Sequence, residues 1–174
     1  MDETLIRTAI RATARISFLI FLGTFLSGTL YRLWPTAITR WLKENRDRFT
    51  LGFAASHAVH LGFILTLVAN WGTRTLNGRG WVVFIAFVTG FPFIYALALA
   101  VLLRDRGSWL TSLRFESFAH YLLWALFTLA FALHGLTKPL FYAPFVLTAL
   151  IALVVRLAGA IRSKRLATFA APAR

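Results

Sequence analysis

Residues 115–136, FESFAHYLLWALFTLAFALHGL, form an apolar stretch that is long enough to cross a lipid bilayer as one helix. The stretch carries His120 and His134, fourteen residues apart. A helix turns by about 100° and rises ~1.5 Å per residue, so the two side chains lie within about 40° of each other on one face, ~21 Å apart. The other two histidines, His57 and His60, lie in a second apolar stretch. Every histidine of the chain is therefore inside a predicted membrane span.

The composition of the chain requires a lipid environment. Of its 174 residues, 59% are hydrophobic and only 14% are charged. A water-soluble domain of this length could not bury so much apolar surface. The predicted fold class is an all-α membrane protein, a bundle of about five transmembrane helices with an amphipathic N-terminal helix. The expected spans are residues 16–34, 50–71, 81–103, 115–136 and 140–161.

Polar segments flank the predicted bundle of residues 16–161. Residues 1–15 carry three arginines at intervals of four, which predicts an amphipathic interfacial helix. The charge pattern also fits a signal peptide, but no clear cleavage site follows. Residues 162–174 form a basic tail that we expect in the cytoplasm. Pro92, inside the third span, predicts a kink that frees a backbone carbonyl.

The charges indicate lipid headgroups rather than nucleic acid as the partner. The net charge is +13, and the basic residues cluster at span ends. Of the basic residues, 12 fall on the side of the C-terminus and 6 on the other side. This asymmetry predicts a cytoplasmic C-terminus and an outer N-terminus, in a membrane such as the bacterial inner membrane. The absence of cysteine excludes disulfides and iron–sulfur clusters, and the absence of a carboxylate at any span centre argues against a proton-coupled carrier.

The intramembrane histidines predict a bound haem b. An ionisable side chain at membrane depth is costly and marks a functional site, and neutral imidazole is a common ligand of metals and haem iron. We expect one haem with one imidazole from each of the two helices. His57 and His60 are only ~4.5 Å apart along the helix axis, which argues against two stacked haems. A second haem, held by one histidine and another group, stays open. Histidines that only bond neighbouring helices are the structural alternative.

The pairing of the axial ligands can be argued from depth in the membrane. The level of His57 lies about three residues, or ~4–5 Å, from that of His120. The levels of His60 and His134 differ by about eight residues, or ~12 Å. Depth alone therefore favours the pair His57–His120.

Three arginines at cytoplasmic span ends are the candidate partners of the haem propionates, through charge-assisted hydrogen bonds. They are Arg46, Arg48 and Arg114. Arg156, within the fifth span, either makes the same contact or, as we expect, extends to the cytoplasmic interface.

Two segments resemble the ferric reductase-like transmembrane domain family. RDRFTLGFAASHAVHLGFI (46–64) is similar to the family's histidine helix that opens with a basic pair and Leu-Gly. AHYLLWALFTLAFALHG (119–135) is similar to its other histidine helix, which often ends in His-Gly. Members include NADPH oxidases, metalloreductases and the haem subunit of the periplasmic methionine sulfoxide reductase system. The resemblance covers roughly residues 16–136.

The resemblance implies a haem b cytochrome, an oxidoreductase or electron-transfer subunit, that carries electrons across the membrane. His120 and His134 correspond to the histidines of the later helix, and His60 or His57 to the outer-haem ligand of the earlier one. This correspondence leans towards the pair His60–His134. Arg46 stands where dihaem members have their inner histidine, which leaves the second haem open.

The resemblance also implies the partners. The chain contains no flavin or nicotinamide domain, so the expected electron donor is a quinone or a separate flavin reductase. The acceptor would be a periplasmic partner enzyme, ferric iron or oxygen. The competing hypothesis is a non-redox membrane protein, an assembly factor or small carrier, whose histidines are structural or bind a metal transiently.

Overall fold

The computed structural model describes residues 2–72, 78–104 and 112–170. Over these ranges the chain is helical and contains no strand, so the all-α class is confirmed. The helices are α1 (Glu3–Leu33), α2 (Ala37–Glu44), α3 (Arg46–Trp71), α4 (Gly78–Leu102), α5 (Leu113–Gly135) and α6 (Pro139–Ala170).

Five of these helices are long and apolar enough to cross a membrane, as predicted. They are α1, α3, α4 over Gly80–Leu102, α5, and α6 over Pro139–Ser163. Their outward faces carry large exposed apolar side chains such as Leu19, Ile85 and Val154. Such faces suit contact with lipid and make the chain an integral membrane protein.

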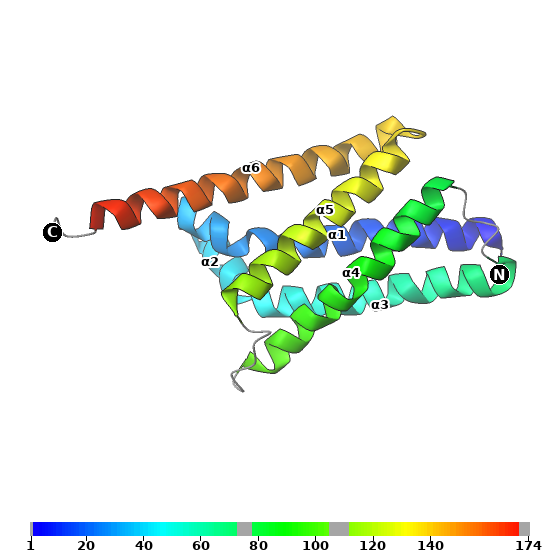
Figure 1. Cartoon of the computed structure of the whole chain (residues 1–174), viewed down its shortest axis with the longest axis horizontal. Coiled ribbons are helices and arrows are strands. Elements are labelled where there is room, and N and C mark those ends of the chain that lie inside the picture. Colours follow the sequence, from blue (N-terminus) through cyan, green and yellow to red (C-terminus); the bar gives the residue numbers. More distant parts are fainter. Residues whose placement is uncertain (1, 73–77, 105–111, 171–174) are drawn as a thin grey trace.

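The helices form a closed bundle. Figure 1 shows α1 and α3 side by side and antiparallel, with the short α2 joining them at one end. Beyond this pair, α3 packs on α4, α4 on α5, α5 on α6 and α6 on α1. The two histidine-bearing helices, α3 and α5, run in the same direction (Figure 1).

Turn residues set several helix ends. Pro35 follows α1, and the Thr36 hydroxyl then caps α2 by accepting from the Thr39 amide at 3.3 Å. Gly72 ends α3 with φ of 68°, a conformation that glycine adopts without steric cost. Ser112 caps α5 through the Phe115 amide. Helix α4 continues through Pro92 as one element.

Two boundaries differ from those expected. Residues 3–15 are the first turns of α1 rather than a separate helix. No proline or other strong breaker separates them from the span, and Ile6 is already fully buried. The basic tail, expected from residue 162, begins inside α6, because the sequence continues with helix-forming residues up to Ala170.

A polar seam holds α1 against α3. Its three pairs are Thr13 with His60 at 2.9 Å, Ser17 with Ser56 at 2.8 Å, and Thr24 with Thr50 at 3.0 Å. Hydrogen bonds between side chains of adjacent helices stabilise membrane bundles, where apolar contacts alone give little driving force. The seam therefore fixes the register of these two helices.

A phenylalanine cluster fills the centre of the bundle. It consists of Phe18, Phe21, Phe53, Phe127 and Phe131, from α1, α3 and α5. The ring centroids of Phe18 and Phe131 are 5.0 Å apart, those of Phe21 and Phe53 5.3 Å, and those of Phe21 and Phe127 5.6 Å. The cluster divides the bundle into two ends, and histidines lie at both.

Candidate functional site

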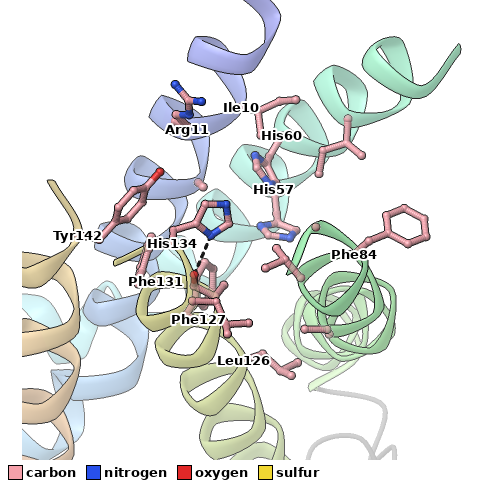
Figure 2. Close-up of a pocket in the computed structure, with 18 of the residues that line it drawn as sticks. Ile10, Arg11, His57, His60, Phe84, Leu126, Phe127, Phe131, His134 and Tyr142 are labelled. Carbon is pink, nitrogen blue, oxygen red and sulfur yellow. Dashed lines mark hydrogen bonds between the residues drawn. The ribbon is translucent and has the colours of Figure 1, made fainter. Parts of the chain in front are cut away.

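A cavity of about 400 Å³ lies at the end of the bundle where α3 and α5 finish. Three of the four histidines line it: His57 and His60 from α3, and His134 from α5. Figure 2 shows their three rings turned towards the same space. We call this space the histidine cavity. Its volume falls within the range of about 300–1,000 Å³ that is usual for cofactor and ligand sites.

The remaining wall of the histidine cavity is mostly apolar. Helix α4 contributes Phe84, and α5 contributes Leu126, Phe127 and Phe131 (Figure 2). A mostly apolar wall with a few convergent polar groups is typical of a cofactor pocket. Two arginines of α1, Arg7 and Arg11, also line the cavity.

His60 is hydrogen-bonded to α1. It is 7% exposed, and its Nδ1 lies 2.9 Å from the hydroxyl of Thr13. The same hydroxyl lies 2.8 Å from the carbonyl oxygen of Ala9 and 3.1 Å from that of Ile10. His60 also has a hydrogen bond to the backbone of Ile10. These contacts anchor the imidazole to the first turns of α1, and a neutral imidazole can bind a metal through either of its nitrogens.

His134 enters the cavity from the opposite wall. Its Nδ1 lies 2.8 Å from the carbonyl oxygen of Ala130, which can only accept a hydrogen bond. The proton is therefore on Nδ1, and Nε2 carries the lone pair. His57 packs beside His60, with 5.2 Å between ring centroids, and is 5% exposed.

His120 lies outside the histidine cavity. It is 1% exposed, and its Nδ1 donates to the carbonyl of Glu116 at 2.5 Å. Its Nε2 accepts from the hydroxyl of Thr24 at 3.0 Å. The space beside it measures only about 10 Å³, enough for roughly one water molecule. Both imidazole nitrogens are therefore engaged with the protein.

The phenylalanine cluster separates His57 from His120. Phe53 and Phe127 contact His57, at 5.7 and 6.0 Å between ring centroids. Phe21 contacts both of these phenylalanines and also His120, at 6.2 Å. The pair that depth favours is thus divided by aromatic rings. The structure brings His134 to the cavity of His57 and His60 instead.

The three arginines expected at propionates lie elsewhere. Arg46 bonds Glu116 at 2.9 Å, in a group that also contains Arg104 and Asp47. We call these four residues, together with His120, the Glu116 network. Arg48 donates to Asn45 at 3.0 Å, and Arg114 is exposed. None of the three lines the histidine cavity.

Arg156 is held within the bundle. Its guanidinium donates to the carbonyl of Phe25 at 2.6 Å. It also lies over the rings of Phe25 and Tyr121, at 4.3 and 4.7 Å from their centroids. A carbonyl and two aromatic faces stabilise the charge, so Arg156 neither extends to the interface as expected nor lines the histidine cavity.

Comparisons of the chain with protein-family models, with curated proteins and with solved structures find no match. The described residues contain no group of three or more potential ligands for a bare metal ion. His60 and His134 reach the same largely apolar space from two different helices.

Two elements of the site were not expected from the sequence. One is Thr13, and the other is the placement of Arg7 and Arg11 at the cavity. Hydroxyl residues recur on α1 at positions 13, 17 and 24, which lie along one helical face. That recurrence was a usable signal for a polar seam, but it does not identify the partner helix.

Proposed function

We propose that the chain is a transmembrane b-type cytochrome, an electron-transfer subunit or oxidoreductase of the ferric reductase-like kind. The observation that carries this proposal is the histidine cavity. There the imidazoles of His60 and His134 reach one largely apolar space from α3 and α5, and the Nδ1 of each is hydrogen-bonded. The resemblance of the two histidine helices to the ferric reductase-like family supports the same conclusion.

We propose one haem b, with His134 and His60 as axial ligands. His60 is preferred to His57 because the hydrogen bond between Thr13 and its Nδ1 would orient a ligand imidazole. His120 is left out because both of its nitrogens already have partners and the space beside it is too small for a haem.

The bound haem would supply one-electron redox chemistry, and the chain would hold and shield it. The phenylalanines and leucine of the wall would give the haem an apolar surround on the side of α4 and α5, while His134 itself is exposed. With the C-terminus in the cytoplasm, the histidine cavity lies towards the outer face. We propose a quinone or a separate flavin reductase as donor. The acceptor would be ferric iron, oxygen or a periplasmic partner enzyme, in a membrane such as the bacterial inner membrane.

A non-redox role, as an assembly factor or small carrier, is the second candidate. The bonding of His120 favours it, because a histidine with both nitrogens bonded inside the protein is a structural residue. If His60 and His134 were structural too, single substitutions would cost stability without removing any cofactor.

The test is a visible absorption spectrum of the full chain, expressed with haem supplied and purified in detergent. A reduced spectrum of the b type, with about one haem per chain by pyridine haemochrome, is the expected result. His134→Ala and His60→Ala should each abolish it, whereas the matched substitution His120→Ala should keep it. A colourless protein overturns the proposal and favours the non-redox role.

A further inference from the structure

We propose that Arg11, assisted by Arg7, binds the carboxylate groups of the ligand in the histidine cavity. The inference rests on the proposed function, because haem b carries two propionates. It assigns this task to the first turns of α1 and not to Arg46, Arg48 or Arg114.

The position of the two arginines is the first argument. Arg7 and Arg11 are four residues apart, so they lie one helical turn apart on the same face of α1, and both line the histidine cavity. Thr13, which bonds the proposed iron ligand His60, follows Arg11 by two residues. The same segment of α1 therefore reaches both the proposed ligand histidine and the cavity wall.

The available hydrogen-bond donors distinguish the two side chains. The Nε and Nη2 of Arg7 both contact Glu3 Oε1 at 2.7 Å. Among the described residues Arg11 makes no ion pair, so its guanidinium fork can bind a carboxylate in a bidentate manner. Arg15, the next arginine of the series, packs over Tyr142 and Phe145 of α6 and does not line the cavity. Arg11 is thus the principal partner.

The charge of the cavity lining is the second argument. No acidic side chain occurs among the residues that the structure places in the wall of the histidine cavity. Arg7 is paired with Glu3, whereas the exposed Arg11 has no ion pair among the described residues, so the lining carries positive charge. An acidic ligand is complementary to this charge. Its carboxylate edge then faces the first turns of α1.

The experiment compares ferric haem with haem dimethyl ester, in which both carboxylates are neutralised. Each is titrated into the haem-free full chain in detergent, and the dissociation constants are read from the absorption change. The dissociation constant of the ester divided by that of haem measures the contribution of the carboxylates to binding. We expect this ratio to fall about tenfold in Arg11→Gln, because a charge-assisted bidentate contact with a haem carboxylate is lost. The double variant Arg7→Gln/Arg11→Gln should lower the ratio further, and Arg11→Lys should give an intermediate ratio. Arg48→Gln and Arg114→Gln are the matched controls and should leave it unchanged.

The ratio is compared between variants because partition of the ester into detergent is common to all of them. An unchanged ratio in Arg11→Gln overturns the inference, as does a fall in Arg48→Gln or Arg114→Gln alone. Equal weakening of both ligands in Arg11→Gln also overturns it, because the role would then be structural. If the unaltered chain binds neither ligand, the proposed function itself fails, and this result is seen before any variant is made.

Discussion

The hydroxyl oxygen of Thr13 on α1 lies 2.9 Å from Nδ1 of His60 on α3. The bond crosses the helix interface and orients the ring towards the histidine cavity. A hydrogen bond to the second nitrogen of a ligand histidine fixes the orientation of its ring.

Replacing Thr13 by valine tests this relationship. Valine keeps the shape but removes the hydroxyl that bonds His60, so haem affinity should fall roughly ten- to a hundredfold. The measurement is a haem titration followed by absorption. Thr66→Val is the control, because the hydroxyl of Thr66 bonds only the Gly62 carbonyl of its own helix at 2.8 Å. Equal haem affinities in the two variants would show that the Thr13 hydroxyl does not contribute to haem binding.

Glu116 should be important for stability and dispensable for haem binding. It is 8% exposed and accepts from Arg46 at 2.9 Å, with Arg104 at 3.7 Å. Glu116→Gln removes a charged hydrogen bond and should cost about 2 kcal/mol of unfolding free energy. Thermal unfolding in detergent measures this loss, and Glu44→Gln, an exposed acid at the end of α2, should have little effect. If Glu116→Gln lost haem without losing stability, the Glu116 end of the bundle would not be separate from the histidine cavity.

Arg156 should stabilise the contact between α6 and α1. Arg156→Gln loses the contacts over Phe25 and Tyr121 and weakens the bond to the Phe25 carbonyl, at a cost of about 1–2 kcal/mol. The matched control is Arg162→Gln, because Arg162 is exposed and donates to the Leu33 carbonyl of α1 at 3.1 Å. If both variants unfold at the same temperature, the aromatic contacts contribute nothing measurable.

Two glycines of α1 should respond in opposite directions to alanine. A Cβ at Gly23 would lie 2.6 Å from Cδ1 of Phe49 on α3, so the ring must shift, whereas a Cβ at Gly28 would meet no atom within 4 Å. We expect Gly23→Ala to destabilise the bundle by about 1–3 kcal/mol. Gly28→Ala should stabilise it by roughly 0.5–1 kcal/mol through helix propensity. Thermal unfolding of both variants checks the signs, and a stabilised Gly23→Ala would show that the Phe49 ring moves aside at little cost.

The orientation can be tested with single cysteines, because the chain has none of its own. Asp2→Cys should react with a membrane-impermeant maleimide in intact spheroplasts. Glu44→Cys should react only after the membrane is permeabilised, since α2 is expected on the cytoplasmic side. The reverse pattern would move the histidine cavity to the cytoplasmic face.

The membrane spans were predictable because a lipid bilayer requires long apolar helices, which are visible as apolar stretches in the sequence. The first residue of α3 was harder to predict. Helix α3 begins at Arg46 and not near residue 50. In its polar first turn, Arg46 is paired with Glu116 of α5, a helix far away in the sequence. Hydropathy records where a segment becomes apolar and carries no information about such a pair.

The arrangement of the histidines could not be read from the sequence. Depth along a span fixes neither the rotation of a helix nor its tilt. The rings of Phe21, Phe53 and Phe127 fill the space between His57 and His120, and Thr24 binds the nitrogen that would face a ligand. Helix packing alone decides these contacts.

The polar seam between α1 and α3 has a consequence for biogenesis. Its three pairs lie within residues 13–60, and only the short α2 segment separates the two helices. The nascent chain can therefore close this hairpin while α5 is still being synthesised. Thr24, already in contact with Thr50, then offers its hydroxyl to His120 when α5 inserts. We therefore expect α5 to dock onto an α1–α3 pair that has already formed.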